Sequence, residues 1–236
     1  MGGQQRVRGG RVLVQLLTDW EVHYLWWFVA DAAVMVPETR IQLRRSFGWC
    51  AEHAWGGVAV QAGLTHGYLH GLAILYDDLV RPVAGRLRGG RWAWRRVLTA
   101  APCPLCGSEP RGGSRSAPQE VLRRGRNPAP MDALVAASEG RWAAWRCGAC
   151  DGSGFPWRCR PHLLAALAAG EALDLAGIRE GMSRLGEGVF RYARGYRLEY
   201  RGMTGAEEVA AFLGAIGWCS GFAPFLAAYG ADPGEE

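Results

Sequence analysis

The sequence predicts a mainly α protein, in which zinc-knuckle loops join helices and sheet is minor or absent. Three observations support this fold class. Apolar residues recur at spacings of three and four, as at Leu69, Leu72 and Tyr76, which is the period of an amphipathic helix. Hydrophobic residues make up 49% of the 236 residues, enough for a substantial core. Cysteine and histidine recur in pairs with the spacing of metal knuckles.

The helical segments can be placed in order along the chain. Residues 12–35 predict one long apolar-rich helix that Pro37 ends, and residues 37–49 predict a shorter one with exposed arginines. A third helical pattern covers residues 65–87 and stops at the glycine- and arginine-rich stretch RLRGGRW.

The second half begins with a stretch of different composition. Residues 107–130 are rich in Pro, Gly, Ser and Arg, which predicts a loop or mobile insertion. The remaining helices are expected at 131–138, after His162, and at 171–194, 205–216 and 219–229, with GYRLEYRGMTG extended or looped. We divide the chain into an N-terminal helical unit, 1–100, carrying Cys50 and His53, and a second unit, 101–236, with the knuckles, the insertion and the C-terminal helices.

Composition bounds the location and the partners. The chain lacks an uninterrupted apolar run of about 18 residues, so we expect no membrane span. Asp19 and Glu21 interrupt the first apolar run, which argues against a signal peptide and favours the cytoplasm.

The net charge of +5 and the clusters RLRGGRWAWRR and VLRRGR would suit nucleic acid. However, all 27 basic residues are arginine and none is lysine. A GC-rich genome produces that skew, which weakens the argument, and we expect no nucleic-acid partner. The eleven tryptophans predict either an aromatic core or an aromatic-lined pocket.

The seven cysteines should be reduced in the cytoplasm, so a disulfide framework is not expected. Cys219 stands alone and is interpreted as a small core residue. The other six cysteines combine with two histidines in four pairs, each spaced i, i+3. The pairs are Cys50/His53, Cys103/Cys106, Cys147/Cys150 and Cys159/His162.

These four pairs supply the ligands of two zinc sites. Zinc takes four nitrogen or sulfur ligands in a tetrahedron, so eight ligands predict about two zinc ions per chain. Which pairs share an ion is open. Loop closure favours joining Cys147/Cys150 to Cys159/His162, because the connecting loop is short. A third arrangement would give an all-thiolate site beside a Cys2His2 site.

The chain also resembles a family of uncharacterised bacterial proteins built from a duplicated unit, in which C-P-x-C is followed by a helix and by G-[FL]-C-x-x-H. The resemblance covers most of the chain, through YLWWFVADAAVMVPETRIQLRRSFGWCAEHAW, GLAILYDDLV, CPLC, FPWRCRPHLLAAL and the tail FRYARGYRLEYRGMTGAEEVAAFLGAIGW. It implies zinc binding and a fold, but no activity.

This chain departs from that pattern, because the first unit lacks its own C-P-x-C and CGAC has no counterpart. The resemblance therefore implies a replacement, in which Cys147 and Cys150 serve Cys50 and His53. The second unit would keep Cys103, Cys106, Cys159 and His162. We rank this replacement pairing slightly above the short-loop pairing.

Three further histidines are weak catalytic candidates. His66 and His70 are expected at i, i+4 on one helix face, but Gly67 stands where the general base of a zincin would be. His23 lies near Glu21 and a tryptophan pair, and acid–base work there would need groups from other segments.

Two functions remain open from the sequence. The first is a zinc-binding helical protein with structural zinc that acts as a binding or scaffold protein. The alternative is an enzyme of bacterial specialised metabolism with a tryptophan-lined pocket for a small-molecule ligand. Its zinc would be structural or, with less support, catalytic. A deep tryptophan-lined pocket would favour the enzyme, and a filled core would favour the scaffold.

Overall fold

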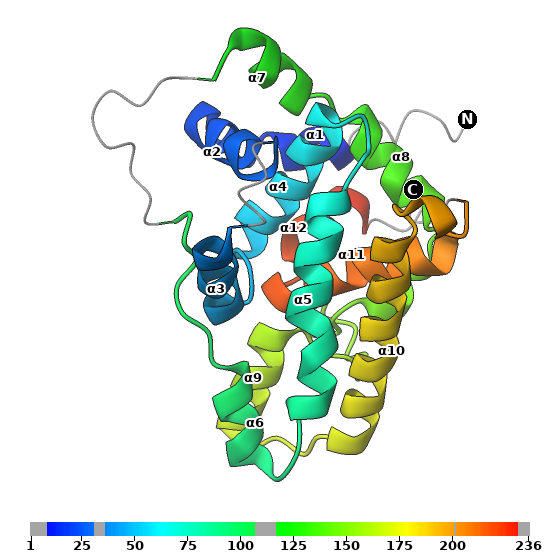
Figure 1. Ribbon diagram of the computed structural model, residues 1–236. Helices are drawn as coiled ribbons and strands as arrows, with labels where there is room; N and C mark the ends of the chain where they lie inside the picture. The colour runs from blue at the N-terminus through cyan, green and yellow to red at the C-terminus, as the bar shows by residue number, and fades with distance from the viewer. Residues whose placement is uncertain (1–8, 31–35, 107–116, 201, 231–236) are drawn as a thin grey trace.

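The fold is seen in a computed structural model (Figure 1), which describes residues 9–30, 36–106, 117–200 and 202–230. Every regular element within these ranges is helical, which confirms the predicted fold class. None of the helices in the described ranges is both long and apolar enough to cross a membrane. The division into units at residue 100 stays a prediction.

Six helices lie in the described residues before position 107. Their bounds are α1 (Gly9–Val14), α2 (Asp19–Ala30), α3 (Pro37–Ser46), α4 (Ala51–Leu64), α5 (His70–Arg86) and α6 (Arg91–Leu98). The second half contains α7 (Gln119–Gly125), α8 (Ala129–Ala137), α9 (Arg160–Ala169), α10 (Leu175–Arg194), α11 (Ala206–Ser220) and α12 (Ala223–Tyr229). Two short 3-10 turns, η2 (Arg141–Trp145) and η3 (Leu198–Tyr200), lie between them.

The longest helices, α5 and α10, run side by side in opposite directions (Figure 1). At one end the Leu69 amide donates to the Tyr196 hydroxyl at 3.1 Å. Further along, the missing side chain of Gly186 brings α10 against the backbone of Arg81. A methyl group there would lie 3.1 Å from the Arg81 Cα, so a small residue sets the spacing of the two helices.

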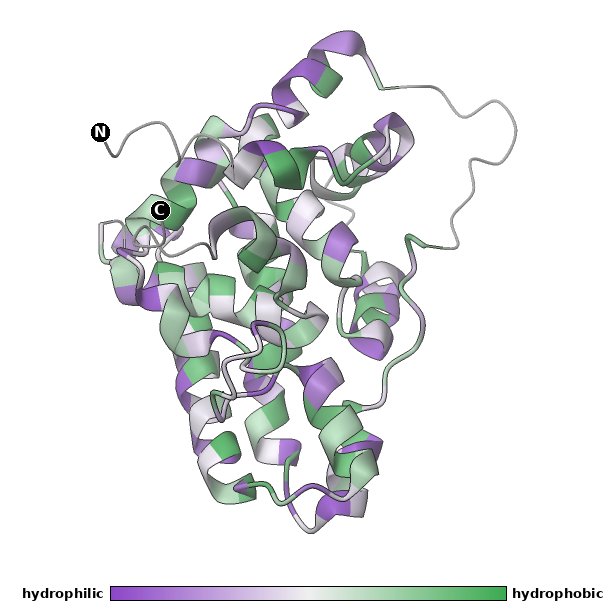
Figure 2. Ribbon diagram, turned by 180° about the vertical axis from the view of Figure 1, so that it is seen from behind, coloured by the Kyte–Doolittle hydropathy of each residue, from purple (hydrophilic) through white to green (hydrophobic). Residues whose placement is uncertain are grey.

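The core lies between α4, α5, α10 and α11 and is aromatic. Trp49, Trp55, Trp94 and Trp218 are fully buried. The Trp55 ring packs on Phe225 with ring centroids 4.5 Å apart, and its indole N–H donates to the Gly221 carbonyl at 2.8 Å. In Figure 2 the outer helices carry bands of both hydrophobic and hydrophilic residues, as expected of helices with one buried face.

Helix α3 is attached to α5 by charge. Arg44 makes a two-pronged contact with Asp78, at 2.7 and 2.8 Å, and Arg40 adds a contact at 3.0 Å. Burial disfavours the charged carboxylate, but these arginines outweigh it and lower the pKa of Asp78. The neighbouring Asp77 is also in an ion pair, with Arg81 one turn away at 2.9 Å.

Three predicted elements differ from the structure. The helix expected over residues 12–35 is interrupted, because α1 ends at Val14 and α2 begins at Asp19, where the Thr18 hydroxyl caps the amide of Glu21. Residues 31–35 lie outside the described ranges. The insertion expected over residues 107–130 contains α7 and the start of α8, and only residues 107–116 lie outside the described ranges. The helix expected at 205–216 continues to Ser220.

Candidate metal centres

The eight cysteine and histidine side chains converge in two groups of four. The first tetrad consists of Cys50, His53, Cys103 and Cys106, and the second consists of Cys147, Cys150, Cys159 and His162. Within each tetrad all ligand atoms lie within 4.8 Å of one another. Each tetrad therefore offers three thiol sulfurs and one imidazole nitrogen to a single ion.

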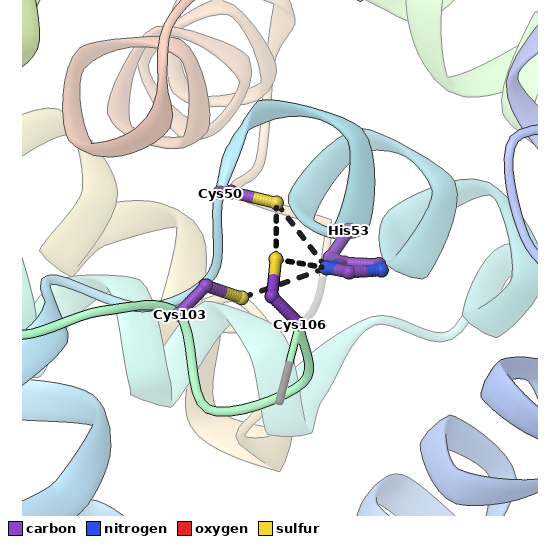
Figure 3. A group of neighbouring side chains, drawn as sticks. All are labelled: Cys50, His53, Cys103 and Cys106. Atoms are coloured by element: carbon purple, nitrogen blue, oxygen red, sulfur yellow. Dashed lines mark hydrogen bonds between the residues drawn. The ribbon is translucent and has the colours of Figure 1, made fainter. Parts of the chain in front are cut away.

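The first tetrad joins the start of α4 to the turn after α6 (Figure 3). The His53 Nδ1 lies 3.2 Å from the Cys50 sulfur, 3.5 Å from that of Cys103 and 3.4 Å from that of Cys106. The sulfurs of Cys50 and Cys106 are 3.6 Å apart. All four ligand atoms point toward one common centre.

The second tetrad repeats this geometry between the turn before residue 151 and the start of α9. The His162 Nδ1 lies 3.4 Å from the Cys147 and Cys150 sulfurs and 3.2 Å from the Cys159 sulfur. The sulfurs of Cys150 and Cys159 are 3.8 Å apart.

These separations fit tetrahedral zinc. Arms of about 2.3 Å to sulfur and about 2.0–2.1 Å to nitrogen imply edges of about 3.8 Å between two sulfurs and about 3.6 Å between sulfur and nitrogen. The sulfur–sulfur contacts of 3.6 and 3.8 Å match the first value, and the sulfur–nitrogen contacts of 3.2 to 3.5 Å lie slightly below the second. Three sulfurs and one nitrogen are also the donors that zinc prefers in structural sites.

A helix start provides the Cys-x-x-His half of each tetrad. Cys50 and Cys159 are the N-cap residues of α4 and α9, with φ and ψ of −65° and 172°, and of −65° and 159°. The histidine follows three residues later, in the first turn, where its ring returns to the side of the N-cap. Neither helix has a side-chain cap, and the backbone amide of the histidine donates toward the sulfur of the N-cap cysteine. The bonds to Cys103 and Cys147, together with burial, outweigh this amide, which lowers the pKa of Cys50 and Cys159, so both pKa values are raised.

A tight turn provides the Cys-x-x-Cys half. In the second tetrad a hydrogen bond joins the Cys150 amide to the Cys147 carbonyl at 2.9 Å. The turn also needs Gly148, because a methyl group on it would lie 2.2 Å from the carbonyl oxygen of Phe155. The loop that leads to Cys159 thus folds directly against the turn.

In each tetrad one cysteine has a lowered pKa and is the first of the thiols to lose its proton. A hydrogen bond from Cys50 lowers the pKa of Cys103 to about 3, against the effect of burial, and His53 adds to the lowering. Hydrogen bonds from Cys150 and Cys159 likewise lower the pKa of Cys147. The thiols that donate these bonds have raised pKa values in turn. Each tetrad therefore has one thiolate that the neighbouring thiols stabilise by hydrogen bonds, and this negative charge suits a cation.

Glu21 of α2 stands behind the first tetrad. Its Oε1 lies 2.8 Å from the His53 Nε2, so the ring nitrogen remote from the sulfurs donates to a carboxylate. Its Oε2 accepts from the Thr18 amide at 2.7 Å. Burial opposes the charge, but the bonds from Thr18 and His53 outweigh it and lower the pKa of Glu21. Carboxylates in this position orient a metal-binding histidine.

The two tetrads differ in their surroundings. Among the described residues, no carboxylate contacts His162, whereas His53 has Glu21. Cys106 is exposed, whereas Cys147 and Cys159 are buried. The first tetrad therefore has the more accessible sulfur but the better supported histidine.

A short segment at the end of α11, Ser220–Phe222, connects the tetrads, and we call it the strap. The Ser220 hydroxyl donates to the carbonyl of Trp49, next to Cys50, at 2.8 Å. The Phe222 amide lies 3.4 Å from the Cys150 sulfur. The strap thus contacts the residue next to Cys50 in the first tetrad and the Cys150 sulfur in the second.

The short-loop pairing is the one that the structure shows. The preferred replacement pairing is wrong, because Cys147 and Cys150 lie with Cys159 and not with Cys50. The physical reason is that α6 carries the chain back to the start of α4, where Cys103 and Cys106 complete the first tetrad. An all-thiolate site is also excluded, since each tetrad has one histidine.

The weak catalytic candidates lie apart from both tetrads. His66 and His70 do not share a helix face, because His66 lies in the turn before α5 with φ of 53° and α5 begins at His70. Rings of Trp20 and Trp26 flank His23, each with centroids 5.8 Å away. Their catalytic roles stay predictions.

Cys219 is fully buried, and burial raises the pKa of its thiol to about 12. A thiol with that pKa stays protonated at neutral pH, and the thiolate is the reactive form. This agrees with its interpretation as a core residue.

Two surface hollows lie elsewhere. One, of about 950 Å³, lies between the end of α5 and the start of α10, and Arg88, Asp174 and Glu180 are among its lining residues. The other, of about 480 Å³, lies between His66 and the start of α8. Neither is lined by tryptophan.

Comparison with known proteins adds no assignment: no family model, curated protein or solved structure matches this chain. The candidate metal centres therefore rest on the geometry of the two tetrads alone. The resemblance to proteins with duplicated C-P-x-C and C-x-x-H units stays a prediction.

Proposed function

We propose that this protein binds two zinc ions, that both ions are structural, and that it acts as a binding or scaffold protein in the cytoplasm. The observation that carries the proposal is the closed coordination that each tetrad offers to an ion. Each tetrad offers four protein ligands, which leaves no position for water or substrate, whereas catalytic zinc sites keep one position open.

The position of the tetrads supports a structural role. Each ties a loop to the first turn of a helix, α4 in one case and α9 in the other. Helix α4 is buried along nearly its whole length, so its placement organises the core. A zinc ion at its start would fix the residues 99–106 against it and remove their freedom in the folded state.

The alternative, an enzyme with a tryptophan-lined pocket, has less support. Its expected pocket would need tryptophan rings around a cavity. The rings of Trp49, Trp55, Trp94 and Trp218 instead fill the core, and the two hollows have other linings.

Metal analysis tests the proposal. Protein purified without added metal should contain two zinc ions per chain, and Cys159→Ser should remove one of them. The lost ion should lower stability by several kcal/mol, because zinc binding in finger peptides is worth about 10–16 kcal/mol. Cys219→Ser is the matched control and should keep both ions. A folded, metal-free protein with an unchanged Tm would contradict the proposal.

A further inference from the structure

Helix α6 presents an exposed tryptophan in a basic surface. Trp92 is 73% exposed, whereas Trp94 and Leu98 on the other side of the helix are buried. We call the exposed surface the α6 basic face, and its residues are Arg86, Arg88, Trp92, Arg95 and Arg96. Within α6, Arg95 and Arg96 follow Trp92 by three and four residues, so they share its side of the helix.

The arginines of this face are unpaired. In the described part of the chain, Arg86, Arg88, Arg95 and Arg96 form no ion pair with a carboxylate. Arginines elsewhere do pair, as Arg44 does with Asp78, Arg141 with Glu207 and Arg191 with Glu208. The composition of the chain explains why arginine is used, but not why four arginines without a carboxylate partner among the described residues lie within six positions of the exposed Trp92 in the sequence.

The charge of the whole chain is concentrated here. The net charge is +5, and residues 79–98 contain six arginines and no acidic residue. The rest of the chain is therefore close to neutral. Arg81 pairs with Asp77, and Arg91 donates to carbonyls at the end of α9, which leaves the four arginines of the face free for a partner.

We propose that the α6 basic face binds single-stranded nucleic acid, with a base stacked on Trp92 and phosphates paired with the flanking arginines. This inference deepens the proposed binding function and rests on it. A stacking ring among cations is the arrangement that holds single strands without sequence preference. Arginine suits it because its planar fork pairs with phosphate oxygens.

The neighbouring charges favour a strand over a lipid surface. Asp174 and Glu180 line the hollow beside Arg88, and Glu171 lies where its carbonyl accepts from Arg91. A flat anionic bilayer against this end of the molecule, drawn at the bottom of Figure 1, would also face these carboxylates. A single strand is narrow enough to contact Trp92, Arg95 and Arg96 on α6 without covering these carboxylates.

This inference changes the expectation from composition. The sequence already shows the cluster RLRGGRWAWRR, but the arginine-only composition of the chain gave it little weight. The structure adds that Arg95 and Arg96 lie on the same side of α6 as the exposed Trp92. It also shows Arg86 and Arg88 exposed just before this helix.

The test uses the full-length, zinc-loaded protein and a short fluorescent oligo(dT), with fluorescence anisotropy as the readout. Four phosphate contacts predict a slope of log K against log salt of about −2.8, at about −0.7 per contact for single strands. The double variant Arg95→Gln/Arg96→Gln should reduce the slope to about −1.4. Trp92→Ala should weaken binding by about tenfold or more, since stacking on an aromatic ring contributes that much per base.

Two control variants match these changes. Arg141→Gln/Arg191→Gln removes the same charge from paired, exposed positions, and Trp27→Ala removes a tryptophan that is 46% exposed on α2. Both should bind like the parent. Zinc content and Tm, measured on the same samples, test the proposed function separately and should be unchanged in all variants.

Three results would overturn the inference. The first is no binding of oligo(dT) at low salt by a protein with two zinc ions. The second is equal weakening by the test and control variants, which would indicate only a general effect of charge. The third is binding to phosphatidylglycerol vesicles without binding to oligo(dT), which would assign the face to a membrane surface.

Discussion

Replacing Glu21 by glutamine should loosen one candidate zinc ion and leave the other unchanged. The carboxylate accepts hydrogen bonds from two residues: from His53 Nε2 at 2.8 Å, and from the amide and hydroxyl of Thr18 at 2.7 and 2.8 Å. Glutamine keeps the shape but has only one oxygen. Its amide N–H group must then face one of the two donors, so either the histidine or the cap of α2 loses its partner.

The size of the effect follows from the burial of the pair. The side chains of His53 and Glu21 are 10% and 19% exposed, so little water can replace the lost bond. Loss of such a partner typically weakens metal binding by about 10–100-fold, which corresponds to about 1.4–2.7 kcal/mol. The second tetrad has no corresponding carboxylate among the described residues and should keep its affinity.

Competition with a chromophoric chelator measures both ions in one titration. In the variant, one of the two zinc ions should be released at a free chelator concentration about 10–100-fold lower than in the parent protein. Glu52→Gln is the matched control: it removes a carboxylate from the same turn as His53, but an exposed one. Thr18→Ala removes the cap contact and should lower the Tm more than the zinc affinity. Equal loosening of both ions, or the same effect from Glu52→Gln, would refute the reasoning.

Other outcomes test the pairing, the turn and the α3–α5 contact. Cys147→Ser with His162→Ala should cost little more stability than either change alone, because ligands of one ion act together, whereas Cys147→Ser with His53→Ala should lose both zinc ions. Additive losses in the first pair would contradict the second tetrad. Gly148→Ala should release one zinc ion, since its methyl group would meet backbone at 2.2 Å, and full retention of two ions by elemental analysis would show that the turn can adapt. Asp78→Asn should lower the free energy of unfolding by about 1.5–3 kcal/mol at neutral pH. Because the pKa of Asp78 is lowered, this stabilisation is present above about pH 4 and is lost as the pH falls through the lower folded pKa. Urea melts of the two proteins should therefore converge in acid, and parallel curves would refute the assignment.

All eight members of the tetrads could be predicted from the sequence. The i, i+3 spacing is a local property, because a helix start or a tight turn brings two such side chains to one side without help from the rest of the fold. The helices were predictable through their period, except α4, α6 and α7, which no predicted helical segment covers. Helix α4 is buried along nearly its whole length and so lacks the polar face that reveals a helical period. The tetrads confirm that these residues come together, and the identity of the metal stays a prediction.

The pairing could not be predicted, because it depends on the path of the chain. The replacement pairing put Cys147 with Cys50 because the first unit lacks a C-P-x-C of its own. The structure shows that loop closure was the better guide for the second tetrad, where nine residues separate Cys150 from Cys159. For the first tetrad no local signal exists, since Cys103 lies 50 positions after His53 and the chain between them must fold first.

Glu21 was missed as a partner of His53 for a related reason. The sequence showed it only as a neighbour of His23. The signal that could have helped is the sequence Thr-x-x-Glu at residues 18–21, which is typical of a capping box. A capping glutamate lies at a helix start, and here its second oxygen reaches a neighbouring helix.

The position of the strap near the C-terminal end means that both tetrads are complete in sequence before the strap is synthesised. The first tetrad has all its ligands once Cys106 has left the ribosome, and the second once His162 has done so. Ser220 and Phe222, which contact the surroundings of both, emerge later than any ligand. If the tetrads bind metal as proposed, a nascent chain can take up both ions before its core is closed. A chain that stops short of residue 220 would then hold two metal-bound loops without the segment that contacts both.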